Sequence, residues 1–187
     1  LEEIAKHLVN KLDQFNERGS GWLLGYVSKC TVSTALYRPL SGSSFLPTPT
    51  IILNKKAVVN IENNDELCFI WSVLAHLHPA ADHPNRLYHY KKFENELNVE
   101  GLTFPLAVAD VAKFEKLNSN LRINVLAYEE KDFIPLYVSK YHDRPIHINL
   151  LLLSDGSKHH YTLVRCMSRL IAGRSLDGHK HYVCDHC

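Results

Sequence analysis

The sequence has almost no net charge, and this absence limits the partners that it can attract. Its 21 Lys and Arg residues nearly balance its 20 Asp and Glu residues, so the net charge at pH 7 is +1 with histidine neutral. A nucleic-acid-binding domain carries a basic patch or stripe that neutralises phosphates. We therefore expect no direct contact of this chain with nucleic acid.

A secretory or membrane-spanning start is also missing. The first residues, LEEIAKHLVNKLDQFNERGSGW, are amphipathic and charged, unlike a signal peptide or a membrane anchor. The five cysteines are odd in number and scattered, which does not fit the disulfide framework of a small secreted domain. We therefore expect reduced thiols, no membrane contact, and an intracellular protein of the cytoplasm or the nucleus.

What is present is an ordinary globular composition, 45% hydrophobic and 22% charged over 187 residues, enough for one domain with a real core. Local patterns predict an α+β fold. Helices are expected at 2–17, 66–78 and in the second half of 102–118. Strands are expected within 22–37 and at 50–53, 57–61, 122–128, 133–138, 146–153 and 160–164, the last two joined as a hairpin by the turn DGSK.

The apolar segment ELCFIWSVLAHLH carries the first candidate for chemistry, Cys68. Asp65 precedes it as a helix N-cap and Pro79 ends it. Cys68 then lies in the first helical turn, where backbone N–H groups and the helix dipole lower the pKa of a thiol. Taken alone, a cysteine in an apolar helix is more often a small core residue. Cys68 becomes a candidate nucleophile once a base is found for it.

His160, in HHYTLV, is that base. A histidine at the start of a central strand, opposite the N-terminus of a cysteine-bearing helix, is typical of papain-like enzymes. His159 points to the other face of the strand. We prefer His160 because it shares a face with Thr162 and Val164.

A third group would orient the imidazole, and the sequence offers Asp155 in the turn or Asn149 on the paired strand. The oxyanion hole would use the backbone N–H of Cys68 with an amide from Asn63 or Asn64, of which we select Asn64. Simple turn chemistry is the alternative explanation of both asparagines.

The chain stops within CDHC, a C-x-x-C pair formed by Cys184 and Cys187. A zinc site needs a second pair of ligands, and His179 and His181 lie too close in sequence for a relaxed tetrahedral site. We interpret the pair as half of a zinc-binding module whose other ligands lie beyond Cys187. Because Leu1 is not a methionine, we also expect the chain to be a piece of a longer protein. No cofactor is required, and zinc is expected only if the chain continues.

Long motifs over residues 20–187 resemble one known region. This region precedes the type B DNA polymerase in Maverick/Polinton-type mobile elements of animals. The motifs are NNDELCFIWSVLAHLHP, FENELNVEGLTFPLAVADVAKFEKLN, INVLAYEE, HINLLLLSDGSKHHYTLVRCMSRL and HKHYVCDHC. In that setting CDHC begins a small zinc module before the polymerase.

Through Cys68 in CFIW and His160 in HYTLV, the chain is also similar to deubiquitinases related to herpesviral large tegument proteins. This similarity implies a papain-like cysteine protease fold, with a buried cysteine-bearing helix on an antiparallel sheet. It also implies ubiquitin or a ubiquitin-like protein as the partner. Cys68 would form an acyl-enzyme after the C-terminal Gly-Gly of ubiquitin, and His160 would transfer the proton.

Two positions depart from these families. The position six residues after the histidine is commonly Asn or Asp in the mobile-element region, and here it is Cys166. The tegument-type proteins place an Asp two residues before the histidine, and here that residue is Lys158. The third member of a triad therefore stays open.

We expect three parts: an extension over 1–55, a papain-like core over 56–176 and a truncated zinc module over 177–187. The apolar residues Leu36, Leu40, Phe45 and Leu46 of the extension would either hold ubiquitin or pack on the core. The alternative to an enzyme is a catalytically inactive papain-like docking module of a mobile-element polymerase polyprotein.

Overall fold

The computed structural model describes residues 6, 9–11, 45–129, 132–156 and 158–172. The chain divides into two compact units, Leu1–Tyr37 and Arg38–Cys187. In the first unit, residues 6 and 9–11 are helical, within the helix expected at 2–17. The strand expected within 22–37 and the residues Leu36 and Leu40 lie outside the described residues. All of the following concerns the second unit.

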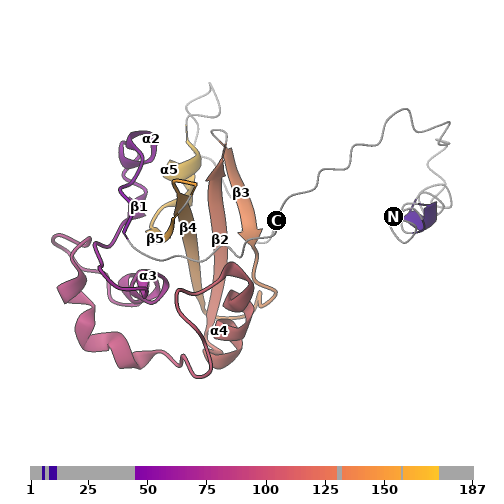
Figure 1. The fold of residues 1–187 in the computed structure, drawn as a ribbon, viewed down its shortest axis with the longest axis horizontal. Helices are drawn as coiled ribbons and strands as arrows, with labels where there is room; N and C mark the ends of the chain where they lie inside the picture. The colour runs from indigo at the N-terminus through magenta and orange to yellow at the C-terminus, as the bar shows by residue number, and fades with distance from the viewer. Residues whose placement is uncertain (1–5, 7–8, 12–44, 130–131, 157, 173–187) are drawn as a thin grey trace. The chain divides into compact units, whose positions relative to one another are not determined.

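The second unit is built on a five-stranded sheet in the order β1-β5-β4-β2-β3, drawn in Figure 1. Its strands are β1 (Val58–Val59), β2 (Leu121–Glu129), β3 (Asp132–Tyr137), β4 (Ile146–Ser154) and β5 (His159–Val164). The sheet is mixed, so the expectation of an antiparallel sheet is wrong for one pair, because β2 and β4 are parallel. The chain moves out to the edge strand β3 and returns to start β4 beside the start of β2.

Helices and short 3₁₀ turns complete an α+β fold, which confirms the predicted class. They are α2 (Thr50–Leu53), α3 (Cys68–Leu77), η1 (Leu87–His89), η2 (Lys91–Glu96), η3 (Val108–Asp110), α4 (Val111–Leu117) and α5 (Met167–Ile171). The strand predicted at 50–53 is the helix α2. Only Ile52 of this apolar run is buried, while Ile51 and Leu53 are exposed. A run so short does not distinguish the two periodicities.

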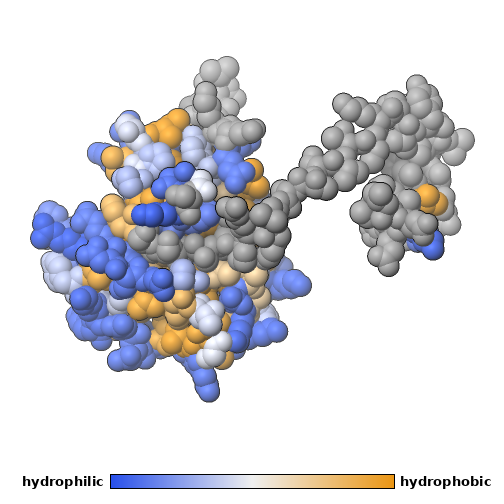
Figure 2. All heavy atoms as spheres, in the orientation of Figure 1, coloured by the Kyte–Doolittle hydropathy of each residue, from blue (hydrophilic) through white to orange (hydrophobic). Residues whose placement is uncertain are grey.

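The sheet is covered on both faces. On the α3 face, residues of α3 and α4 pack on Ile123, Leu150, Leu163 and their neighbours. On the other face, which we call the α5 face, Leu46, Ile52 and Leu170 pack on Leu151, Leu153 and Val164. Figure 1 shows α2 and α5 together at one end of the sheet, and Figure 2 shows hydrophilic side chains gathered over the segment between α3 and α4. Leu46 and Ile52, which we expected in the extension, therefore belong to the core.

The helix α3 is buried from Cys68 to Ala75, as its apolar sequence predicts. It has ten residues, and among the described residues no helix is both long and apolar enough to cross a membrane.

Asp65 fixes the chain that enters α3. Its Oδ1 accepts hydrogen bonds from the Leu67 backbone N–H at 2.9 Å, from Asn63 Nδ2 at 2.7 Å and from Trp71 Nε1 at 3.0 Å. Leu67, rather than Asp65, is the N-cap residue of the helix. Asp65 acts one step earlier, by holding the loop and the first helical turn together.

Replacement of Asp65 by alanine tests this role. Trp71 is 1% exposed, so Asp65→Ala leaves its indole N–H and the Leu67 N–H without acceptors. Such losses cost about 1–3 kcal/mol each. We expect a clear fall in the free energy of unfolding, measured by urea denaturation. Asp82→Ala, at an exposed position, serves as the control and should stay within about 0.5 kcal/mol of the wild type. Equal stabilities of the two variants would contradict this role.

Candidate active site

Cys68 is the first residue of α3, and its side chain is fully buried against β5. The backbone N–H of Tyr161 in β5 hydrogen-bonds to the Cys68 sulfur. One helical turn later, the Ser72 hydroxyl donates to the Tyr161 carbonyl oxygen at 3.1 Å. Two side chains of α3 therefore bind both backbone polar groups of a single residue in β5.

The length of β1 explains this arrangement. β1 ends at Val59, which pairs with Leu163. Along a strand every second residue turns its backbone groups to the same side, so Tyr161 is the next residue of β5 to face this edge. No strand of the described chain continues there to pair with it. Buried backbone groups require partners. Cys68 and Ser72 supply them, which places the N-terminus of α3 at the edge of β5.

The pKa of Cys68 is raised, whereas the sequence analysis expects a helix N-terminus to lower it. Burial raises it from 9.0 to about 12, and the nearby Asp65 carboxylate acts in the same direction. The backbone N–H groups of Tyr161, Phe69 and Cys68 itself lower it, as a helix N-terminus should. Their effect is smaller than that of desolvation, so in this state Cys68 is a neutral thiol.

His160 is fully buried on the α5 face of β5. It lies opposite Leu153, and Thr162 lies opposite Leu151, so the expected alternation that joins His160 with Thr162 and Val164 is confirmed. The Phe45 ring packs edge-on against the imidazole, with the ring centroids 5.6 Å apart. His159, by contrast, is only partly buried.

The Cys68 side chain and the main chain of His160 therefore meet at one peptide bond. The Tyr161 N–H that binds the Cys68 sulfur belongs to the peptide bond between His160 and Tyr161. The two side chains come to this peptide from different directions, because α3 packs on one face of the sheet and His160 points to the other. Both are 0% exposed, so no substrate reaches either in this state.

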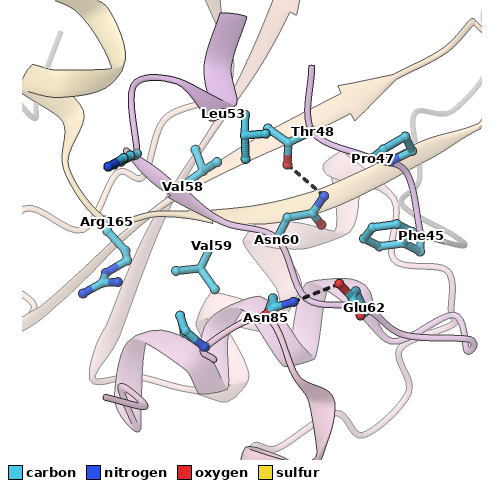
Figure 3. Close-up of a pocket in the computed structure, with 12 residues that line it drawn as sticks. Phe45, Pro47, Thr48, Leu53, Val58, Val59, Asn60, Glu62, Asn85 and Arg165 are labelled. Atoms are coloured by element: carbon cyan, nitrogen blue, oxygen red, sulfur yellow. Dashed lines mark hydrogen bonds between the residues drawn. The ribbon is translucent and has the colours of Figure 1, made fainter. Parts of the chain in front are cut away.

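Residues 45–48, which we call the cover segment, close the site on the α5 face. Phe45 contacts His160, and Leu46 packs in the core. Asn60 anchors the segment, because its Nδ2 donates to the Leu46 carbonyl oxygen at 2.7 Å and to Thr48 Oγ1 at 3.0 Å. Figure 3 shows Asn60 pointing toward Thr48 across β1.

The two candidates for the third group lie at opposite ends of the β4–β5 hairpin. Asp155 is exposed in the β4–β5 turn, where its Oδ1 accepts the Lys158 N–H at 2.7 Å and its own N–H donates to the Lys158 carbonyl. Asn149 pairs with Val164, four residues beyond His160, or about 13 Å along the strand. We therefore drop Asn149, and Asp155 has a turn-forming role that explains its presence.

The asparagines before α3 differ from the expectation. The side chain of Asn64, our choice for the oxyanion hole, is exposed. Asn63 is only 2% exposed, and its Nδ2 donates to the backbone oxygen and Oδ1 of Asp65. Of the two residues, Asn63 is thus the one built into the start of the helix.

Position 166 is the N-cap of α5, two residues beyond the end of β5 and about 20 Å from His160 along an extended chain. A residue there caps a helix, a position that Asn and Asp favour, and does not orient the histidine. Cys166 Sγ lies 3.3 Å from Ser168 Oγ. The Ser168 hydrogen bond, followed by interactions with Arg169, lowers the pKa of the thiol from 9.0 to about 7.

The candidate zinc ligands Cys184 and Cys187, with His179 and His181, lie outside the described residues. Within the described residues, no three His, Cys, Asp or Glu side chains are grouped to hold a metal ion. Sequence reasoning missed Ser72, Tyr161 and Asn60, and it did not foresee the contact of Phe45 with His160. A single serine four residues after Cys68 in an apolar helix was the one available signal, because such a residue needs a polar partner.

No family model, curated protein or solved structure matches this chain.

The two described cysteines should differ sharply in reactivity. With a pKa of about 7, about half of Cys166 is thiolate at pH 7, against about one in 10⁵ for Cys68. We expect iodoacetamide to modify Cys166 quickly and Cys68 only after unfolding, as followed by mass spectrometry of the digested protein. Faster modification of Cys68 than of Cys166 in the folded chain would contradict these environments.

Cys68 should also make the fold sensitive to alkali. Its folded pKa lies above its unfolded value, so the stabilisation is complete below about pH 9 and is lost as the pH rises towards about 12. One proton contributes a slope of about 1.4 kcal/mol per pH unit. Urea denaturation should give a smaller slope for Cys68→Ala than for wild type above about pH 9. Cys166→Ala should keep the wild-type slope, and an unchanged slope in Cys68→Ala would refute the assignment.

Proposed function

We propose that this chain is a cysteine-type deubiquitinase, with Cys68 as the nucleophile and His160 as the base. The supporting observation is that the N-terminus of α3 and the histidine of β5 meet at one peptide bond, through the Tyr161 N–H. A thiol at a helix N-terminus beside a strand that carries a buried histidine is the arrangement from which papain-like chemistry is built.

In the proposed reaction, His160 removes the proton of the Cys68 thiol as the sulfur attacks the carbonyl carbon of the last glycine of ubiquitin. The same proton passes to the departing amine, which leaves an acyl-enzyme. Water then attacks the thioester with His160 as base and releases the ubiquitin carboxylate and the free thiol. The backbone N–H groups at the start of α3 that stabilise the thiolate would also stabilise the oxyanion.

The described state is closed, so catalysis includes an opening step. Phe45 covers His160, and neither side chain of the pair is exposed. Displacement of the cover segment would expose His160 on the α5 face of β5, and access of the narrow Gly-Gly tail to Cys68 also requires a movement at the start of α3. Because burial is the main cause of the raised pKa of Cys68, access of water or contact with a protonated His160 would lower that pKa again.

A specific observation also favours the second candidate function, a non-catalytic docking module. Cys68 already has a structural task, since with Ser72 it satisfies the backbone of Tyr161. A neutral, buried thiol in such a place explains its presence without chemistry.

A ubiquitin probe with a C-terminal propargylamide separates the two functions. We expect the wild-type chain to gain the mass of one ubiquitin, detected by intact-protein mass spectrometry. Cys68→Ala and His160→Ala should abolish the adduct. Cys166→Ala should retain it, although Cys166 is the more ionised thiol. No adduct with the wild type, or an adduct that survives Cys68→Ala, would rule out the proposed enzyme. If only a probe made from a ubiquitin-like protein reacts, the proposed cysteine chemistry stands, and the substrate is that ubiquitin-like protein instead of ubiquitin.

Phe45 offers a test of the opening step. Removal of its ring should expose His160 and speed the formation of the adduct by about tenfold, equal to about 1.4 kcal/mol in the opening equilibrium. Ile51→Ala, at an exposed apolar residue of α2, is the matched control and should not change the rate. Equal rates for Phe45→Ala and the wild type would show that the cover segment does not limit access.

A further inference from the structure

A groove lies over β1, outside the Cys68–His160 site. Its volume is about 480 Å³. The cover segment forms one wall, β1 runs through it, and Arg165 lies on the opposite side (Figure 3). It is lined by Phe45, Pro47, Thr48, Leu53, Lys56, Val58, Val59, Asn60, Glu62, Pro84, Asn85 and Arg165.

The groove exposes a strand edge that no described residue pairs with. β1 is the outermost strand of the sheet and bonds to β5 through Val59 and through the Ala57 carbonyl, which accepts the Arg165 N–H at 2.8 Å. Val58 and Asn60 alternate with these residues, so their backbone groups face away from β5. Among the described residues, neither makes a backbone hydrogen bond. A strand edge of this kind pairs readily with an added strand.

Asn60 adds an unsatisfied acceptor to this edge. Its Nδ2 donates to the Leu46 carbonyl and to Thr48 Oγ1, which fixes the orientation of the amide. Its Oδ1 is buried and has no hydrogen-bond partner among the residues that the structure describes. A buried acceptor in this position requires a donor, and a backbone N–H of an added peptide is such a donor.

Charge distinguishes the two ends of the groove. Lys56 and Arg165 lie where β1 begins, and Arg169 contacts the Lys56 carbonyl through Nη1 at 3.3 Å. Beyond the other end of β1, Glu62 is held by Asn85, whose Nδ2 donates to Glu62 Oε1 at 2.8 Å. A strand that pairs antiparallel with β1 would bring its C-terminal end to the cations, where acidic groups are favoured.

We propose that this groove binds an extended, acidic peptide of a partner protein, which pairs antiparallel with β1 and places its acidic residues beside Lys56 and Arg165. The segment of this chain that precedes the groove lacks the required charge, because residues 18–44 contain no Asp or Glu and three Lys or Arg residues. The peptide site does not depend on the proposed hydrolysis, since neither Cys68 nor His160 lines the groove.

The test is fluorescence anisotropy of the full chain with a labelled peptide, Thr-Val-Thr-Val-Asp-Asp. We expect a dissociation constant of about 10–100 μM, and binding at least about tenfold weaker for the same peptide ending in Lys-Lys. A peptide N-methylated at alternate residues should also bind weakly, because the pairing uses backbone N–H groups.

Paired charge reversals locate the site. Lys56→Glu with Arg165→Glu should weaken binding by at least about tenfold. Lys91→Glu with Lys140→Glu, at exposed positions outside the groove, changes the net charge equally and should have no effect. Arg165→Gln provides a milder variant, and thermal unfolding verifies that each variant is folded.

Three results would overturn the proposal: equal binding of the Asp-Asp and Lys-Lys peptides, equal effects of the two charge reversals, or no binding at about 1 mM peptide. Labelling of Cys68 by the ubiquitin probe is a separate measurement, so the failure of either proposal can be distinguished from failure of the other.

Discussion

The contact of Cys68 and Ser72 with the backbone of Tyr161 is the constraint around which the rest of the candidate site is arranged. It exists because β1 ends at Val59, one pairing position too early to reach Tyr161. Side chains of α3 make the hydrogen bonds to Tyr161 that a longer β1 would make. These bonds hold the N-terminus of α3 at the edge of β5. The outer edge of β1 pairs with no other described residue, and the groove lies there.

This contact creates a conflict between packing and reactivity. The peptide N–H groups around the Cys68 sulfur favour a thiolate, while complete burial disfavours it, and burial has the larger effect. His160 is also fully buried, between the Phe45 ring and the sheet. The proposed chemistry therefore requires the site to open. The cover segment is the part of the described chain whose movement would expose His160.

The thiol with the lower pKa, Cys166, is not the proposed nucleophile, Cys68. It is the more acidic of the two described thiols because Ser168 and Arg169 stabilise its thiolate at the start of α5. Yet it stands at a helix cap, far along the chain from His160. A substitution at this position therefore changes the N-cap of α5 and not a residue beside His160 in β5.

The sequence by itself determined the α+β class, the apolar helix that begins near Cys68, and the hairpin that presents His160, because helical and strand periodicity are local properties. It did not determine that β2 and β4 are parallel or that Thr50–Leu53 is helical, since strand order and short apolar runs are decided by packing. Nor did it determine the ionisation of Cys68. The sequence predicts the helix N-terminus, which lowers the pKa of Cys68. The desolvation that raises this pKa by more arises only when segments distant in sequence pack over the thiol.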